Sequence, residues 1–136
     1  MRRPFLGERA SRSLLIDERH VGLYVQLTGD HNPIHLSEEY ARKTLFKRTI
    51  IHEGITTGLV STLIAEELPG PGSVFFHADW SFQNPVHVGD TITAEAEVMS
   101  VHHQKPVVVL RTSVYNQDDT MVLDGQATIY LLGPEN

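Results

Sequence analysis

The chain has 136 residues, of which 40% are hydrophobic and 21% charged, with a formal net charge of −6 and no cysteine. This length allows a single domain with its own buried core, and we expect that domain to span residues 1–136. The lack of cysteine excludes disulfides and thiol chemistry, and the acidic balance argues against nucleic-acid binding, which needs clustered Lys and Arg.

The N-terminal residues 1–8 carry basic side chains but no apolar run long enough for a secretory signal. No later stretch of the sequence has the length and hydrophobicity of a membrane span, and none has the composition of a linker or a repeat. We therefore expect a cytoplasmic protein without a membrane segment.

Two helices are predicted on either side of a rigid loop near residue 32. Asp17 is a good N-cap for a helix over residues 17–27, whose apolar residues recur at helical spacing. Ser37 precedes two glutamates and has the same role for a second, short helix. Between them, the Asn32-Pro33 step disfavours helical geometry at the asparagine and fixes φ at the proline, which predicts a short rigid loop.

This loop carries a carboxylate and an imidazole, Asp30 and His35, five positions apart. A rigid loop is able to aim both side chains at one point, and these are groups that enzymes often use to move protons near neutral pH. The pattern therefore predicts an acid–base pair. The alternative interpretation is an ordinary turn followed by a structural histidine, because Asp and Asn are common turn residues.

A long helix followed by strands is expected in the rest of the chain. Residues 54–68 have Leu and Ile at helical spacing before a Pro-Gly-Pro-Gly stop. Small residues are expected to let strands pack closely on this helix: Gly58, Ser61, Thr62 and Ala65. Strands are predicted over residues 73–82, 85–88, 91–101, 106–115 and 121–132, with Gly89-Asp90 as a turn rather than a site. A central helix followed by an antiparallel meander indicates an α+β fold in which the sheet wraps the helix.

Residues 24–41 form a dense motif, in which an aromatic residue is followed by Leu-Thr-Gly-Asp-x-Asn-Pro-Ile-His and then by Ala41. This string resembles the signature of the MaoC-like hydratases, also called (R)-specific enoyl-CoA hydratases or hydratase 2. Similar runs at residues 46–52, 68–72 and 82–90 extend the resemblance over nearly the whole chain. The resemblance implies the hot-dog fold, an antiparallel sheet wrapped around a long helix, and normally a homodimer whose two sheets join edge to edge.

The resemblance also implies reversible hydration of a trans-2-enoyl thioester, with Asp30 and His35 as the catalytic dyad. We expect the dyad to hold one water, to share the acid and base roles, and to add both parts of water from one face. A backbone N–H of Glu53 or Gly54, at the positive end of the long helix, is expected to stabilise the charge on the thioester oxygen. The reaction needs no cofactor. Two further residues are expected to support the site: Asn32 and His52.

The substrate implied by the resemblance is an acyl-CoA or the same acyl chain bound to an acyl carrier protein. Four basic residues just after the motif are candidates to receive the phosphates of coenzyme A: Arg42, Lys43, Lys47 and Arg48. The alternative interpretation of these four is a solvated helix end whose charge complements the helix dipole. The side chains expected to close the acyl tunnel are Leu23, Tyr24, Phe46 and Ile55.

The chain departs from the family at the start of the long helix. The family usually reads Pro-Ile-Val-His-Gly, whereas this chain reads Thr-Ile-Ile-His-Glu over residues 49–53, with the glycine displaced to Gly54. Glu53 is expected to crowd the acyl thioester and to oppose the charge of the enolate. Gly58 lacks a hydroxyl that is common at its position. These departures imply altered substrate choice or reduced activity.

Two other functions are compatible with a hot-dog fold. An acyl-CoA thioesterase needs a carboxylate on or beside the long helix, and three are available: Glu53, Glu66 and Glu67. A MaoC-like subunit that binds acyl chains or a catalytic partner without reacting itself is the other alternative. The presence of both Asp30 and His35 disfavours this non-catalytic role.

A metal site is not expected from the sequence. A proline separates His31 from His35, which weakens a ligand set with Asp30, and adjacent strand residues such as His102 and His103 point to opposite faces. The remaining histidines without a partner pattern are expected to be surface or structural residues: His20, His77 and His87.

Overall fold

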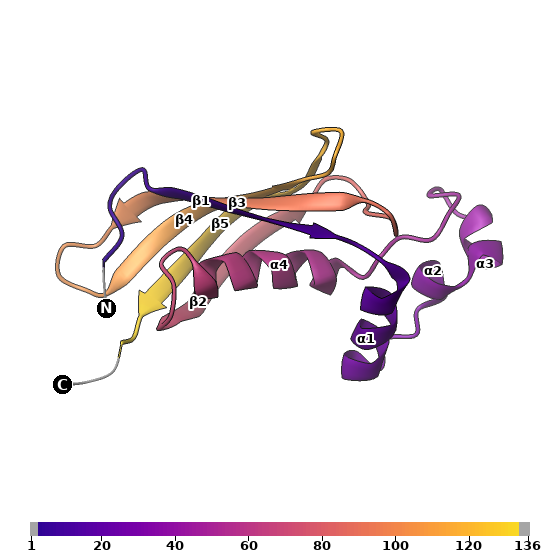
Figure 1. The fold of residues 1–136 in the computed structure, drawn as a ribbon, viewed down its shortest axis with the longest axis horizontal. Helices are drawn as coiled ribbons and strands as arrows, with labels where there is room; N and C mark the ends of the chain where they lie inside the picture. Colours follow the sequence, from indigo (N-terminus) through magenta and orange to yellow (C-terminus); the bar gives the residue numbers. More distant parts are fainter. Residues whose placement is uncertain (1–2, 134–136) are drawn as a thin grey trace.

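The computed structural model describes residues 3–133, which form one sheet, one long helix and a group of short helices (Figure 1). In chain order the elements are β1 (Arg9–Leu15), α1 (Glu18–Thr28), α2 (Pro33–Leu36), α3 (Glu38–Arg42), α4 (Glu53–Glu66), β2 (Ser73–Phe82), β3 (Thr91–Val101), β4 (Val107–Tyr115) and β5 (Met121–Leu131). The ends of the domain predicted over residues 1–136 lie outside the described residues.

The sheet has five strands in the order β1-β3-β4-β5-β2, and every neighbouring pair is antiparallel. Helix α4 lies along one face of this sheet (Figure 1). Leu63 and Ile64 of α4 are fully buried with Ile92, Val108 and Ile129 of the strands. This apolar contact between helix and sheet is the core, so the predicted α+β arrangement is the observed one.

One predicted strand is absent from the described residues, and one strand was missed. Residues 85–88 form no strand; they are an irregular segment in which the Val86 carbonyl accepts a hydrogen bond from the Ile51 N–H at 2.8 Å. The edge strand β1 was not predicted at all, because its sequence RASRSLL is polar and only half-buried. Its place in the sheet depends on pairing with β3, as in Arg9 opposite Glu97, and local sequence does not encode that pairing.

Helix α4 turns its bulky aliphatic residues to the sheet, contrary to the prediction that its small residues would do so. Leu59, Val60 and Leu63 are buried, whereas Gly58 and Ala65 are exposed. Burying large side chains removes more apolar area from water, which explains this orientation. Within residues 3–133, no helix has the combined length and apolar character needed to cross a bilayer.

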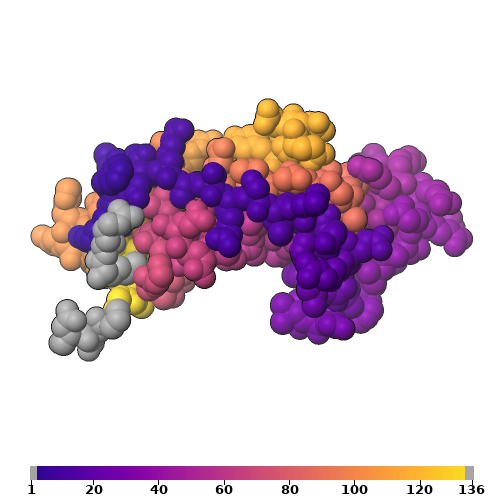
Figure 2. Space-filling model, viewed as in Figure 1, coloured from indigo at the N-terminus to yellow at the C-terminus, as the bar shows by residue number. Residues whose placement is uncertain are grey.

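Helices α1, α2 and α3 project from one end of the sheet and α4 (Figure 1; Figure 2, indigo to purple). The Asp17 carboxylate accepts from the His20 N–H at 3.2 Å, and His20 Nδ1 accepts from the Asp17 N–H at 3.0 Å. Ser37 caps α3 by accepting from the Tyr40 N–H at 3.1 Å. Both predicted N-caps are confirmed, and His20 has a structural role.

Both ends of this helical projection are bound to one short segment, residues 86–90. At the first end, the Ile16 N–H donates to the Asp90 carbonyl at 2.9 Å and the Gly89 N–H donates to the Ile16 carbonyl at 2.8 Å. At the second end, the Ile51 N–H donates to Val86, as described above. The projection is therefore anchored to the sheet at its entry and its exit.

Candidate active site

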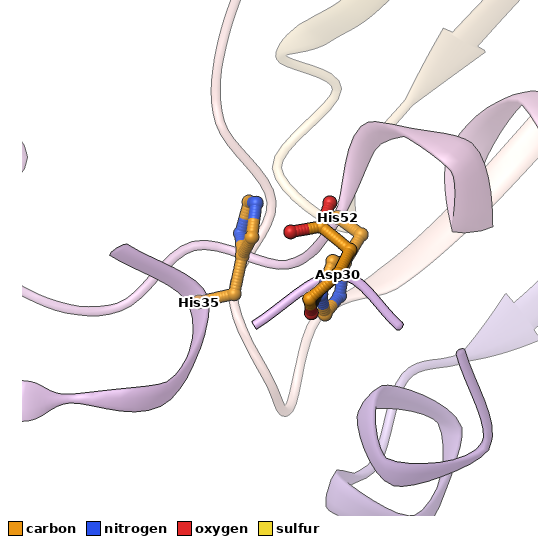
Figure 3. A group of neighbouring side chains, drawn as sticks. All are labelled: Asp30, His35 and His52. Carbon is orange, nitrogen blue, oxygen red and sulfur yellow. Dashed lines mark hydrogen bonds between the residues drawn. The ribbon is translucent and has the colours of Figure 1, made fainter. Parts of the chain in front are cut away.

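Three side chains meet where the projection joins α4: Asp30, His35 and His52 (Figure 3). One carboxylate oxygen and one ring nitrogen from each histidine all lie within 4.8 Å of one another. Asp30 lies on the loop after α1, His35 lies in α2, and His52 is the N-cap residue of α4. The structure brings together the predicted pair, but the prediction that both lie on a loop was wrong for His35.

The loop that carries Asp30 is held by local hydrogen bonds. Gly29 has a φ of 76°, a left-handed conformation that lets the chain leave α1 sharply. The Asp30 N–H donates to the Thr28 hydroxyl at 3.2 Å, and Asp30 Oδ1 accepts from the Asn32 N–H at 3.0 Å. Asn32 in turn caps α2 by accepting from the Ile34 N–H at 3.4 Å. The support predicted for Asn32 is therefore that of a helix cap.

The hydrogen bond of His35 determines which of its nitrogens is available for chemistry. Nδ1 lies 2.8 Å from the Ile50 carbonyl oxygen, which only accepts hydrogen bonds, so Nδ1 carries the hydrogen. In the neutral ring Nε2 then has a lone pair. His35 as a whole is buried, at 9% exposure. The arrangement suits a group that takes up and returns a proton.

Helix α4 begins beside this cluster, at Glu53. The first N–H groups of a helix have no partner inside it, and no side chain caps this end of α4 in the described part of the chain. The positive end of the helix dipole adds to these donors. Glu53 and Gly54 directly follow His52 in the chain. Their N–H groups are therefore two donors suited to binding a negatively charged atom.

A mainly apolar cavity of about 470 Å³ opens beside the first turn of α4. Its lining includes Phe46, Ile50 and Phe82, with Glu53 and Thr56 contributing polar groups from the helix. Of the side chains predicted to close an acyl tunnel, Phe46 lines this cavity. A cavity of this size and character suits a short apolar chain.

The four predicted basic residues are all exposed. They lie in the part of the chain that runs from the end of α3 toward α4. Arg42 ends α3 and Lys43 is its C-cap, which fits the helix-end interpretation for these two. Lys47 and Arg48 lie on the loop between α3 and α4, where Lys47 has a left-handed φ of 67°. Burial, and after it the Arg48 charge, lowers the pKa of His87.

The potential metal ligands that the structure brings together differ from the two sets that the sequence suggested. His31 turns away and bonds the Gly29 carbonyl at 2.9 Å, whereas His52 joins Asp30 and His35. Two histidines and one carboxylate are a known metal-ligand set. The His35 and His52 rings are tilted by 32° with 4.0 Å between centroids, and one nitrogen of each lies within hydrogen-bond distance of a backbone carbonyl oxygen.

Two other sequence candidates have structural roles. Asp90 accepts from the His87 N–H and from Gln117 Nε2, both at 2.9 Å, which confirms the turn predicted there. His102 follows β3 in a turn, where its Nδ1 accepts from the N–H groups of Gln104 and Lys105. From the sequence, His52 was expected only to support the site, whereas it lies in the cluster itself. No spacing rule connects position 52 with position 30.

Comparison with known proteins agrees with this geometry. A family model described as "MaoC like domain" matches residues 7–118. The chain is 35% identical over 126 residues to an (R)-specific enoyl-CoA hydratase of Aeromonas caviae, covering 93% of this chain and 94% of that protein. It is 37% identical over 106 residues to a 3-hydroxybutyryl-CoA dehydratase of Methylorubrum extorquens, covering 78% of this chain and 67% of that protein.

A solved structure gives the same result for the fold. The (R)-hydratase from A. caviae involved in PHA biosynthesis superposes with a TM-score of 0.89 at 34% identity, over 94% of this chain and 97% of that one. The hot-dog fold expected from the motif is thereby confirmed. The chain belongs to the MaoC-like domain family.

Proposed function

We propose that this protein is an (R)-specific enoyl-CoA hydratase, which adds water reversibly to trans-2-enoyl thioesters and removes it from 3-hydroxyacyl thioesters. One observation carries the proposal: the Asp30 carboxylate and His35 meet beside the donor-rich start of α4. The relatives named above are hydratases and dehydratases, which supports the same chemistry here. The reaction makes the protein a hydro-lyase.

In the proposed reaction, one water lies between Asp30 and His35. Its oxygen attacks C3 of the enoyl chain as the dyad takes one proton from the water, and the dyad then delivers that same proton to C2. Both additions occur from the face that the dyad occupies, which makes the addition syn. His35 suits this exchange because its Nδ1–H is held by Ile50 and its Nε2 remains available.

The negative charge that develops on the thioester oxygen needs a donor. We propose the N–H groups of Glu53 and Gly54, in the uncapped first turn of α4, for this role. Loss of one such donor typically lowers the rate by a factor on the order of 10²–10³. Helix α4 therefore serves the reaction as well as the core.

For the substrate we propose an acyl chain in the cavity beside α4, carried by coenzyme A or by an acyl carrier protein. Exposed Lys47 and Arg48 lie on the loop that also supplies Phe46 to that cavity. Positive charge at this place is suited to the phosphates of either carrier. Arg42 and Lys43 are close in sequence and extend the same basic surface.

We also propose a cytoplasmic homodimer that joins through the free edge of β2, with each chain one hot-dog domain. Strand β2 pairs with β5 on one side only. Its exposed apolar side chains include Val74 at 46%, Phe76 at 66% and Phe82 at 52% exposure. An apolar edge strand of this kind is a template for pairing with a second copy.

The thioesterase alternative has less support from the geometry. Glu67 lies beyond the far end of α4 and pairs with Arg12 at 3.3 Å, and Glu66 is the last residue of the helix. Neither carboxylate is near the start of α4. Only Glu53 remains as a candidate base for water directed at the carbonyl.

The deciding experiment mixes the purified protein with crotonyl-CoA and follows loss of the conjugated enoyl thioester together with release of free thiol. We expect enoyl loss without thiol, abolished by Asp30→Asn. Thiol release that survives Asp30→Asn would instead identify a thioesterase. No reaction with crotonyl-CoA, longer enoyl-CoA or enoyl carrier protein would overturn the enzymatic proposal and favour the non-catalytic subunit.

A further inference from the structure

His52 is a fully buried titratable residue that the proposed reaction does not use. Its relative exposure is 0%, yet it lies at the N-cap of α4 and in the same cluster as the dyad. An N-cap residue usually binds a helix N–H through its side chain, but the His52 side chain makes no such bond. The side chain is therefore occupied with something other than capping.

The contacts of His52 point to that other role. Its Nε2 lies 3.1 Å from the backbone carbonyl oxygen of Asp30. Because a carbonyl only accepts, Nε2 must carry the hydrogen and donate it. The other nitrogen, Nδ1, is buried and has no hydrogen-bond partner within residues 3–133. Within the described residues, the one hydrogen bond of the His52 ring is thus donated to the backbone carbonyl of Asp30.

This hydrogen bond is the third that fixes the position of Asp30. The Asp30 N–H is already bound by the Thr28 hydroxyl at 3.2 Å, and its carboxylate by the Asn32 N–H at 3.0 Å. These two bonds come from neighbours in the same loop. His52 is 22 residues away in sequence and adds the link between that loop and α4.

The His52 ring also contacts two aromatic rings. Its centroid lies 4.0 Å from that of His35 and 4.6 Å from that of Tyr24. Tyr24 in turn reaches the first turn of α4, where a Cβ on Gly54 would overlap the end of its side chain. One buried ring is therefore in contact with both members of the dyad and with the aromatic residue that covers the helix start.

We propose that His52 is a positioning residue, which ties the Asp30 loop and the His35 ring to the start of α4 and so sets the dyad against the oxyanion donors. The inference rests on the proposed hydratase function. Its physical basis is that a displacement of about 1 Å in a catalytic group costs a factor on the order of 10² in rate. His52 acts through Asp30 and His35 and touches no reacting atom.

Two variants separate the hydrogen bond from the ring contact. His52→Gln keeps a donor on a side chain of similar length, and His52→Phe keeps a ring but has no donor. For His52→Phe we expect kcat with crotonyl-CoA to fall by a factor on the order of 10², with KM within about twofold of wild type. His52→Gln should recover most of that loss. His103→Gln, on an exposed turn residue, is the control and should match wild type.

The kinetic result is decisive in both directions. Equal kcat in wild type and His52→Phe, or a change confined to KM, would overturn the inference. A wild-type protein that hydrates no enoyl thioester would overturn the proposed function instead, which is a separate outcome. Circular dichroism on each variant establishes that it is folded before its rate is interpreted.

A second measurement needs no variant and guards against one that fails to fold. Nitrogen-15 correlation spectra of the wild-type imidazoles report which ring nitrogen is protonated. We expect hydrogen on Nε2 of His52 and on Nδ1 of His35. Hydrogen on Nδ1 of His52 would mean that it does not donate to Asp30, and the inference would fail whatever the activity.

Discussion

The phenol group of Tyr24 lies against the Cα of Gly54, in the space that a side chain on Gly54 would need. A Cβ built there would lie 2.5 Å from the Tyr24 Cζ, closer than real side chains approach. This contact gives a reason for glycine at position 54. Tyr24 of α1 therefore fills the space that is left open because Gly54 of α4 has no side chain.

Gly54→Ala should therefore destabilise the fold. We expect a loss of about 1–3 kcal/mol from overpacking, because Tyr24 must shift to admit the methyl group. Gly58→Ala is the matched control in the same helix, since a Cβ there meets nothing within 4 Å. It should gain up to about 1 kcal/mol from helix propensity. Urea unfolding of both variants measures the difference, and equal stabilities would contradict the Tyr24 contact.

His35→Gln should abolish most of the hydratase activity without unfolding the protein. General acid–base groups contribute a factor on the order of 10²–10⁴, and we expect kcat/KM to fall within this range. His31→Gln is the neighbouring control, because His31 is exposed and bonds only the loop carbonyl of Gly29. Steady-state rates with crotonyl-CoA check the prediction. A similar loss in both variants would point to damage of the loop rather than of the dyad.

Glu53→Gln should raise kcat slightly. Glu53 is exposed and lines the cavity at the first turn of α4, where its charge opposes that of the developing enolate. For two charges about 8 Å apart in a water-like medium the repulsion is about 0.5 kcal/mol, or about twofold in rate. Glu66→Gln, at the far end of the helix, should leave kcat unchanged. A fall in kcat for Glu53→Gln would instead give this carboxylate a positive role in the reaction.

The stability of the protein should fall as the pH is lowered through the ordinary range of histidine, in part because of His87. Burial and the Arg48 charge lower its pKa, and the charges of Asp90 and Glu38 oppose this shift more weakly. A histidine whose pKa is lower in the folded state binds a proton first in the unfolded state, so acid favours unfolding. This destabilising contribution is absent above the pKa that His87 has in the unfolded chain, and it develops as the pH falls below that pKa.

His87→Gln should flatten that pH dependence. We expect Tm to fall less between about pH 7.5 and about pH 5.5 in the variant than in wild type. The exposed His103→Gln is the control, with a wild-type profile. Thermal unfolding followed by circular dichroism measures both. Parallel profiles for wild type and His87→Gln would contradict the assignment.

Phe76→Lys should dissociate the proposed dimer. Phe76 is 66% exposed on β2, and a charge on this edge opposes pairing with a second copy. Leu15→Lys tests the opposite edge of the sheet, where Leu15 of β1 is 60% exposed. Sedimentation velocity should show a monomer for the first variant and a dimer for the second. The reverse result would move the interface to β1.

Much of this fold follows from local sequence, and the exceptions have a common cause. Asp17 and Ser37 cap helices as predicted, and the buried alternation of Ile92, Ala94 and Ala96 marks β3 correctly. These features depend on residues a few positions apart. Strand β1 and the orientation of α4 depend instead on which distant elements pack together, and no local pattern encodes that.

The candidate site shows the same division. The motif around Asp30 and His35 is contiguous, so both residues were identified from sequence. His52 owes its place to a hydrogen bond across 22 positions and to ring contact with His35, which only the folded chain reveals. Glu53 and Gly54 were placed at a helix start correctly, but the reason for their order, the Tyr24 contact, needed the structure.

The anchoring of the projection to residues 86–90 has a consequence for how such proteins diversify. Asp30 and His35 belong to one stretch of chain that enters at Ile16 and leaves at Ile51, just before α4, with both ends bound to that single segment. All five strands of the sheet and helix α4 lie outside this stretch, so an insertion between these two points interrupts none of them. The fold thus separates the sheet and α4 from the stretch that carries Asp30 and His35. New chemistry is able to arise in that stretch without a new core.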